Sequence, residues 1–317
     1  MNLTDIINNI NNYKTMNNKL KKKITIINDA AWVGYEIAEG LRELDKDVLY
    51  LPRNFAGPNA KSNFIYSVYG KIFSPVINAI KATGIIHVNY ALQDAFCVRL
   101  LGKKINVLHC HGTDLFGLLD EQFKKESKDL TRWKTIIEGN IKSARTVLVS
   151  TPEMLTLAKQ IRRDAEYLPN PVDVKRFSPK TIEQKEVRAI GFDSWYEKVP
   201  KEVIDFLEKN NVKVDVYDRR PFSYLEFQKT LTKYQIYIDR IHTKGVSSFS
   251  KACLEAMSCG LVTIDFRHKE NVIERATNIL NYKNRKNEAE KNRKFILEKH
   301  DRLKVTEKLL EIYNRQE

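Results

Sequence analysis

The feature that most constrains the fold is a regular alternation of short, β-branched apolar runs with longer amphipathic stretches. The apolar runs fall at residues 23–28, 47–52, 85–90, 105–110, 146–151 and 165–170, and again at 187–192, 213–218, 235–240 and 261–266. Each run has the length of a strand, and the stretches between most of them have helical spacing. Apolar strands that alternate with helices predict parallel sheets covered on both faces.

The runs form two groups separated by a polar segment near residues 170–185, so the pattern indicates two units in tandem. In that segment Asn170-Pro171 and Ser178-Pro179 interrupt regular structure. The expected class is α/β, with two Rossmann-like, doubly wound parallel-sheet domains that face each other across a cleft. The expected parts are an N-terminal helical extension at 1–22, a first domain at 23–178, a second domain at 179–280, and a C-terminal helix at 281–317 that packs back on the body.

Both ends of the chain carry helical patterns of their own. Residues 2–20 place Ile6 and Ile10 at helical spacing and are followed by lysines. Two interpretations fit this end: a helix that lies on an anionic membrane surface, and a helix packed on the first domain. At the other end, an apolar stripe from Phe295 to Tyr313 predicts a helix that covers the body.

The charge balance favours an anionic partner. Lys and Arg total 54 against 40 for Asp and Glu, a formal net charge of +14 among 317 residues. A phosphorylated substrate, an anionic membrane or nucleic acid would each suit that excess. The charge is spread along the chain, with its densest parts at 19–23 and 283–294, and it forms no basic arm. Basic and aromatic residues are not interleaved either, so we expect no nucleic-acid partner.

Cysteine usage and hydropathy point to the cytoplasm. The four cysteines form no CxxC pair and no zinc-like spacing with histidine, so we expect free thiols and no metal site. No run reaches about 18 apolar residues, and the first residues lack the apolar core of a signal peptide. The expected location is cytoplasmic, with peripheral contact at the inner face of the membrane if the first helix binds lipid.

Ligands of doubly wound sheets bind beyond the carboxyl ends of the strands, so residues that follow strands are the first candidates. After the run 23–28, the loop NDAAWVG ends at Gly34. The loop lacks the GxGxxG spacing of a dinucleotide site, so NAD or FAD is not supported. Gly34 either lets a ligand approach the backbone or is an ordinary turn glycine.

The segment His111-Gly-Thr-Asp114 follows the run 105–110. A histidine and an aspartate beside a glycine can hydrogen-bond a polyhydroxylated ligand, although lone histidines often have structural roles. His87 lies inside a run, which is typical of a packed core histidine.

A loop rich in Gly and Ser precedes the helical stretch near 249–258. Free amides and the helix dipole make such a helix start an anion site, while serine capping alone would also explain the loop. The candidate anion ligands of this segment are Lys244, Ser247, Ser248 and Lys251.

Glu255 lies within that helix among small and apolar residues. A buried carboxylate requires a partner. A ribose diol would supply one, and a structural salt bridge is the alternative.

Four segments together resemble a known family. They are IIHVNYA (85–91), VLHCHGTDL (107–115), LPNPVDVKRFSP (168–179) and LEAMSCGLVTI (254–264). In order and spacing they resemble the retaining nucleotide-sugar glycosyltransferases of the GT-B fold, in the family-four-like group also called glycosyl transferases group 1. The resemblance spans about residues 23–280.

The resemblance implies roles for particular residues. The donor nucleotide would lie against the C-terminal domain, with Glu255 on the ribose hydroxyls. The start of that helix and a basic pair would hold the diphosphate. His111 and Asp114 would approach the donor sugar, and the acceptor would enter over the N-terminal domain.

The implied reaction is transfer of a sugar from a nucleotide-diphosphate donor to a glycan, lipid-linked or cell-envelope acceptor. It would proceed with retention and without a metal, and the nucleotide sugar would be a substrate, so no separate cofactor is expected.

The sequence departs from the family at the expected phosphate ligands. Ser247 stands where many members have a first glutamate, Phe192 replaces the first residue of the basic pair, and Lys198 falls about one position late. The segment YIDRIH (237–242) resembles a less common branch that lacks the first glutamate, which would bring Asp239 and Arg240 into the site.

These departures keep two other readings open. One is a non-catalytic GT-B binding or scaffold subunit that has lost donor-phosphate chemistry. The other is a different GT-B enzyme, such as a nucleotide-sugar epimerase or a phosphorylase.

Overall fold

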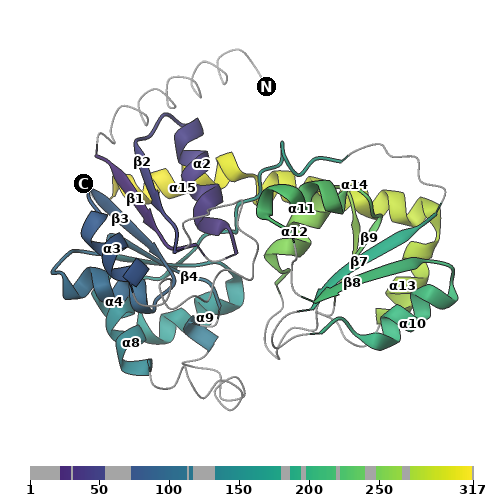
Figure 1. Cartoon of the computed structure of the whole chain (residues 1–317), viewed down its shortest axis with the longest axis horizontal. Coiled ribbons are helices and arrows are strands. Elements are labelled where there is room, and N and C mark those ends of the chain that lie inside the picture. Colours follow the sequence, from purple (N-terminus) through teal and green to yellow (C-terminus); the bar gives the residue numbers. More distant parts are fainter. Residues whose placement is uncertain are drawn as a thin grey trace. The chain divides into compact units, whose positions relative to one another are not determined.

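The computed structural model describes residues 22–29, 31–53, 73–112, 114–116, 133–179, 186–193, 198–218, 222–239, 248–265 and 272–315. These residues form two compact units, each an α/β unit with a parallel sheet, as expected (Figure 1). Within the described ranges, unit 1 takes the residues up to Arg53, from Phe73 to Pro171, and from Arg302 onward. Unit 2 takes those from Val172 to Asp301.

Unit 1 has a six-stranded parallel sheet in the order β2-β1-β3-β4-β5-β6. Its strands are β1 (Ile24–Ile27), β2 (Val48–Leu51), β3 (Ile85–Asn89), β4 (Val107–Cys110), β5 (Thr146–Val149) and β6 (Glu166–Tyr167). Every residue of the adjacent strands β1, β3 and β4 is buried. Burial on both faces is why the sequence shows continuous apolar runs rather than alternation.

Helices cover both faces of this sheet. They are α2 (Val33–Glu43), α3 (Ser74–Lys81), α4 (Gln93–Leu100), α8 (Lys134–Ser143), α9 (Pro152–Ile161) and α15 (Arg302–Asn314). On one face α2 and α15 bury Ile37 and Leu309 against Ile26. On the other face α3, α4, α8 and α9 build a second core, which includes Val98 and Leu108.

Unit 2 has a four-stranded parallel sheet in the order β10-β9-β7-β8. Its strands are β7 (Arg188–Asp193), β8 (Lys213–Asp218), β9 (Ile236–Ile238) and β10 (Val262–Ile264), and its helices are α10 (Lys201–Lys209), α11 (Tyr224–Leu231), α12 (Lys251–Ser258), α13 (Val272–Leu280) and α14 (Tyr282–Lys299). Helices α10 and α13 pack on one face through Val203, Leu207 and Ile279. Edge strand β8 is partly or fully exposed along its length.

The division between the units falls at Pro171–Val172, before the expected boundary at 178. Residues 172–179 join unit 2 because Phe177 is buried against Tyr224 and Phe227, at ring distances of 5.7 and 6.4 Å. The hydroxyl of Ser258 also donates to the Phe177 carbonyl at 2.6 Å.

The expected single helix at 281–317 is two helices, α14 and α15, which belong to different units. The break lies at His300 and Asp301. There the Val172 amide donates to the His300 carbonyl at 2.7 Å, and Asp301 forms a parallel bridge with Val172. A backbone that pairs with an extended segment cannot continue a helix, so the chain stops and restarts.

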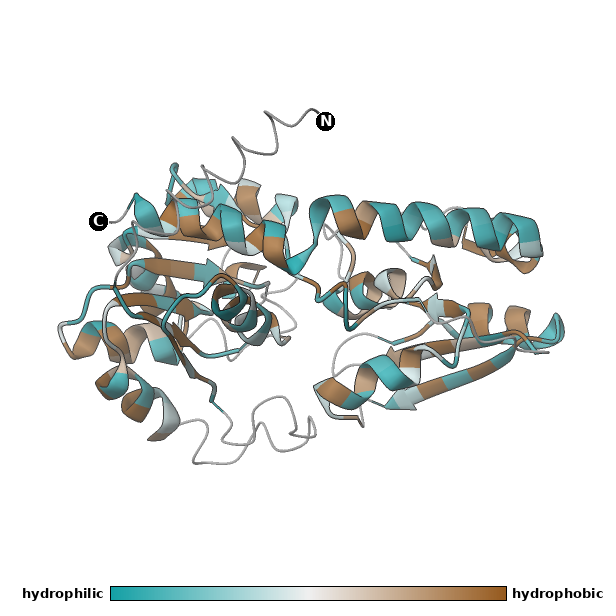
Figure 2. Ribbon diagram, turned by 90° about the horizontal axis from the view of Figure 1, so that it is seen from above, coloured by the Kyte–Doolittle hydropathy of each residue, from teal (hydrophilic) through white to brown (hydrophobic). Residues whose placement is uncertain are grey.

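The strands are predominantly hydrophobic and the long helix α14 is predominantly hydrophilic (Figure 2). None of the described helices combines the length and the hydropathy that a bilayer-spanning segment requires. The expected N-terminal helix at 1–22 lies almost wholly outside the described residues, which begin at Lys22.

Candidate functional site

Glu255 lies on α12, the helix that follows β9 in unit 2, and its side chain is fully buried. Lys251, one turn earlier, places its Nζ 2.5 Å from Glu255 Oε1. The Tyr224 hydroxyl donates to the same oxygen at 2.8 Å. The structural salt bridge weighed from the sequence is therefore present. Lys251 was expected to bind a diphosphate, but here it compensates the charge of Glu255. A buried ion pair is stable only with additional hydrogen bonds, and the Tyr224 hydroxyl supplies one.

The first turn of α12 is capped by Ser250, one of the residues that sequence reasoning missed. Its Oγ accepts from the Cys253 amide at 3.1 Å and donates to Asp239 Oδ1 at 2.9 Å. Asp239 is buried just after β9 and also accepts from the Ser250 amide at 3.4 Å. The predicted Asp239 thus holds the cap of the predicted anion-binding helix. Of the other residues expected here, Ser248 lies just before this cap.

Three residues expected to bind the donor, Arg240, Lys244 and Ser247, lie outside the described residues.

Lys198 follows β7, the strand next to β9, and so lies at the same edge of the sheet as Asp239. It is 64% exposed and its Nζ lies 3.0 Å from Asp193 Oδ2. Phe192, which replaces the family's basic residue, is buried against Tyr217 at a ring distance of 5.7 Å. The side chain at that position is part of the core of unit 2.

In unit 1, His111 follows β4 and its Nε2 lies 3.0 Å from Asn89 Oδ1, at the end of β3. The Asn89 amide nitrogen donates to the Asn28 carbonyl, after β1, at 3.3 Å. This bond orients the Asn89 amide so that its oxygen faces His111. Nε2 is therefore the donor, and Nδ1 carries the lone pair that can accept a hydrogen bond.

Asp114 is buried beneath the loop that begins at His111. Its Oδ1 accepts from the His111 and Gly112 amides, both at 3.0 Å, and its Oδ2 accepts from the Ala91 amide at 3.1 Å. Burial raises the pKa of Asp114 to about 6, against the lowering effect of these bonds. Asp114 therefore shapes the loop that carries His111.

Three histidine rings lie in a series that ends at His111: His87 and His109 are fully buried, and His111 is half-buried. His109 lies 4.1 Å from His111 and 5.6 Å from His87 between ring centroids, and His87 Nδ1 is 2.6 Å from the Tyr313 hydroxyl on α15. Burial lowers the pKa of His87 and of His111 to about 3, and that of His109 well below its usual value. The rings are neutral at physiological pH, and His87 is the core histidine that the sequence predicted.

Gly34 lies in the first turn of α2, and its amide is already engaged in a hydrogen bond. It donates to Asp29 Oδ1 at 3.0 Å, the Tyr35 amide donates to Oδ2 at 3.3 Å, and the Tyr50 hydroxyl bonds the same carboxylate. A Cβ on Gly34 would lie 2.6 Å from the Asn28 carbonyl oxygen, so the glycine allows close approach of the chain's own backbone. Burial raises the pKa of Asp29 to about 7.

The loop between β1 and α2 contains left-handed residues that are not glycine. Asn28, Ala31 and Trp32 have φ values of 64°, 51° and 65°. Such conformations cost of order 1–3 kcal/mol each and gather at functional sites. The loop is held in this shape by Asp29, which bonds the start of α2.

Within the described part of the chain, no group of three or more His, Cys, Asp or Glu side chains is placed to hold a metal ion.

The fold is similar to solved glycosyltransferase structures. Sucrose-phosphate synthase from Thermosynechococcus elongatus gives a TM-score of 0.61 at 12% identity, over 93% of this chain and 99% of that chain. The catalytic domain of starch synthase IV from Arabidopsis thaliana, bound to ADP and acarbose, gives 0.59 at 10% identity, over 93% and 99%. A glycosyltransferase from Rickettsia africae gives 0.57 at 11% identity, over 93% and 98%.

Neither a protein-family model nor a curated protein sequence matches the chain. At these identities the likeness is one of fold. It covers nearly the whole length of both partners and includes two parallel-sheet units. The chain therefore has the GT-B fold of the glycosyltransferases, as its sequence predicted.

Proposed function

We propose that this chain is a glycosyltransferase that moves a sugar from a nucleotide-diphosphate donor to a glycan, lipid-linked or other cell-envelope acceptor. The observation that carries the proposal is the buried Glu255 carboxylate on α12, at the position expected to hold a donor's ribose, in a GT-B chain. The starch synthase neighbour was solved with ADP, which supports a nucleoside diphosphate as the ligand class.

In unit 2, Lys251 and Asp239 position the groups that would bind the nucleotide. Lys251 offsets the Glu255 charge, so the carboxylate is held in place to accept from ribose hydroxyls. Asp239 fixes the Ser250 cap, which sets the direction of the first amides of α12. Amides at a helix start favour phosphate oxygens, so the diphosphate would bind at this end of α12.

In unit 1, His111 can accept a hydrogen bond from the donor sugar. Its Nδ1 accepts a hydrogen bond because Asn89 engages Nε2, and its low pKa keeps the ring neutral. A sugar hydroxyl is the donor that suits this atom. Asp114 acts by holding the loop through three backbone amides.

Retention of the anomeric configuration and independence from metal are part of the proposal. The product's anomeric proton signal in NMR tests retention. Assay with and without EDTA tests the metal: equal rates are expected, and loss of activity with EDTA would contradict this part.

One observation favours a non-catalytic binding subunit as the second candidate. At the carboxyl edge of the unit 2 sheet, Phe192 is buried in the core and Lys251 is committed to Glu255. Among the described residues, Lys198 is the remaining predicted cation, and it pairs with Asp193. A diphosphate without cations is poorly compensated.

A thermal-shift screen with UDP, GDP and ADP, and with their sugar conjugates, tests the nucleotide site, because a ligand that binds only the folded state raises Tm. We expect one nucleotide to raise Tm and Glu255→Gln to abolish the rise. Glu298→Gln, on the exposed face of α14, is the matched control and should keep it. If no nucleotide shifts Tm at millimolar concentration, the transferase proposal is wrong.

We also propose that the chain makes peripheral contact with anionic lipid, where a lipid-linked acceptor would lie. The lysines near 19–23 motivate this proposal. Flotation with phosphatidylserine vesicles, with and without residues 1–22, tests it. Binding should require these residues and weaken with salt. Binding that ignores salt, or that survives their removal, would contradict the electrostatic contact.

A further inference from the structure

Helix α14 in unit 2 has, beside its first three turns, a hollow that the nucleotide site does not use. Its volume is about 380 Å³, within the usual range for small-ligand sites. Tyr234 and Gln235, which line it, precede β9, and Gly260 precedes β10. The hollow therefore lies at the amino edge of the sheet, opposite the edge that carries Asp239.

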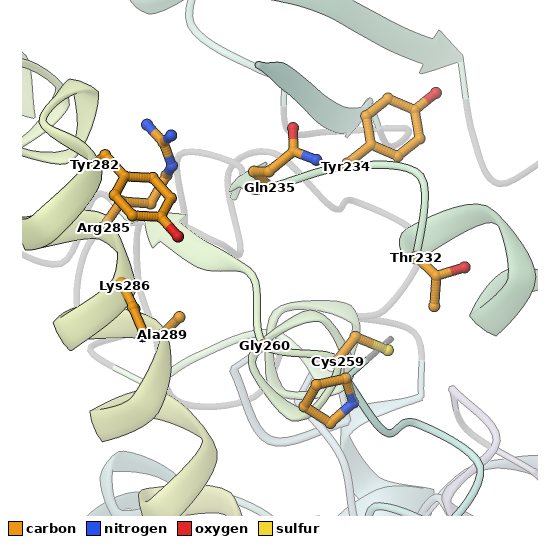
Figure 3. Close-up of a pocket in the computed structure, with 10 residues that line it drawn as sticks. Thr232, Tyr234, Gln235, Cys259, Gly260, Tyr282, Arg285, Lys286 and Ala289 are labelled. Carbon is orange, nitrogen blue, oxygen red and sulfur yellow. The ribbon is translucent and has the colours of Figure 1, made fainter. Parts of the chain in front are cut away.

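The hollow is cationic. Arg285 and Lys286 line it, and none of its lining residues in the described chain is Asp or Glu (Figure 3). Arg285 is held in place because one guanidinium nitrogen donates to the carbonyls of Ile279 and Leu280, at 3.1 and 3.2 Å. Lys286 is exposed and forms no ion pair with another described residue. Two cations that face a hollow without acids attract an anion.

An exposed aromatic ring stands on the same wall. Tyr282 is 71% exposed, and the Arg285 guanidinium carbon lies 5.8 Å from its ring centroid. In Figure 3 the Tyr282 hydroxyl is directed toward the open space of the hollow. A tyrosine ring next to a cation offers a ligand an apolar face and, through its hydroxyl, a hydrogen bond.

A second hollow, of about 390 Å³, lies on another flank of the same turns of α14. It is lined by four asparagines, Asn278, Asn284, Asn287 and Asn292, together with Glu288 and Lys291. Glu288 is paired with Arg275 at 2.7 Å. Asn284 donates to the Asn278 side chain, and Asn292 donates to the Leu261 carbonyl at 3.4 Å, which orients these amides. Each amide group keeps a further donor or acceptor, which suits ligands that carry many hydroxyls.

We propose that the first half of α14 is a binding surface for an acidic saccharide chain. The cations would take its acidic groups, Tyr282 would stack on a sugar ring, and the asparagines would bind hydroxyls. Residues 282, 285, 286 and 289 share one helix face and 284, 287, 288 and 291 another, so one chain could engage both hollows. This surface is separate from Glu255 and does not depend on transferase activity.

Binding of a labelled hexagalacturonate to the full chain tests the proposal, with neutral maltohexaose and glucose 6-phosphate as comparison ligands. We expect Tyr282→Ala and Lys286→Glu each to weaken binding at least about fivefold, and Tyr282→Phe to keep most of it. Asn287→Asp, which adds a negative charge in the second hollow, should weaken binding several-fold.

Lys294→Glu is the matched control, since Lys294 is 78% exposed on the same helix and lines neither hollow. It should change binding less than about twofold. The proposal is wrong if Lys294→Glu weakens binding as much as Lys286→Glu, because binding would then report only net charge. It is also wrong if maltohexaose binds equally well, or if glucose 6-phosphate binds and the hexamer does not.

The nucleotide screen separates this proposal from the transferase. Tyr282→Ala and Lys286→Glu should keep the nucleotide-induced rise in Tm, because neither residue contacts the Glu255 site. Loss of that rise in both variants would indicate a wider structural change and would contradict a separate surface.

Discussion

At the scale of single residues, Asn89 sets the chemistry of His111. Its amide is oriented by the Asn28 carbonyl, and its oxygen then engages His111 Nε2. We predict that Asn89→Leu releases the ring, shifts the tautomer toward Nδ1–H, and costs about 1 kcal/mol of unfolding free energy. Nitrogen-15 NMR of the imidazoles measures the tautomer directly.

Asn78→Leu is the control for that experiment, because Asn78 is buried and bonds the Leu51 carbonyl. It should lower stability and leave the His111 tautomer unchanged. An unchanged tautomer in Asn89→Leu would show that Asn89 does not position His111.

Asp29 predicts a pH dependence of stability. Its folded pKa of about 7 lies above the 3.8 of an ordinary carboxyl. Between about pH 4 and 7 the unfolded chain loses this proton first, so the folded state becomes less stable as pH rises. We expect Asp29→Asn to reduce this pH-dependent loss of unfolding free energy by about 2 kcal/mol. The value is smaller than the whole pKa shift would give, because Asp29 is partly exposed and solvent screens its charge.

Urea unfolding between pH 4 and 7 provides the measurement, with Asp45→Asn as the control. Asp45 is exposed and has a positive φ that asparagine accepts. An equal slope in Asp29→Asn and the unmodified chain would mean that Asp29 titrates as an ordinary surface group.

Glu255 was located from the sequence as an acid among small and apolar residues, and Asp239 from the resemblance of YIDRIH to a branch of the family. Sequence reasoning could not give their partners. Tyr224 is 31 residues from Glu255 in sequence, and Asn89 is 22 from His111. Contacts of that kind depend on strand order and helix placement, which a single sequence does not encode as a local pattern.

At the scale of elements, α12 depends on the Lys251–Glu255 pair. We predict that Lys251→Met leaves a buried carboxylate without its cation and destabilises the chain by about 3–5 kcal/mol. Adding Glu255→Gln should recover part of this loss, since the uncompensated charge is gone. Urea unfolding of the two variants measures both effects.

The exposed pair Lys294–Glu298, with the same spacing at 3.9 Å, is the matched control. Lys294→Met should cost no more than about 1 kcal/mol. Equal costs at both pairs would show that burial does not govern the α12 pair.

Tyr313 links helix α15 to the sheet of unit 1, because its hydroxyl forms a hydrogen bond with His87 Nδ1 on β3. Tyr313→Phe keeps the ring and removes this bond, so we predict a loss of about 1–2 kcal/mol in a thermal or urea melt. Stability equal to that of the unmodified chain would show that the bond adds nothing to packing.

The elements themselves were largely predictable. All ten expected strands are present, because apolar runs bounded by turn residues are a strong local signal. The division of the last helix into α14 and α15 was not. His300-Asp301 contains neither Gly nor Pro, and the break comes from pairing with Val172, which lies far away in sequence.

At the scale of the whole molecule, the structure shows where part of the net charge of +14 lies. Cations that pair with a carboxylate, such as Lys251 with Glu255 and Arg302 with Glu36, contribute nothing to this excess. Others face solvent, as Lys286 does on α14. The exposed cations on α14 are the part of this charge that the proposed acidic-saccharide surface uses.

The most direct test of the account is product formation from the nucleotide sugar that raises Tm. Purified chain, that donor and candidate acceptors are followed by NMR, and Glu255→Gln is compared with Glu298→Gln. We predict a transferred sugar with the donor's anomeric configuration, a loss of at least about a hundredfold in kcat/KM for Glu255→Gln, and near-unchanged turnover for Glu298→Gln. Full activity in a folded Glu255→Gln variant would contradict the account.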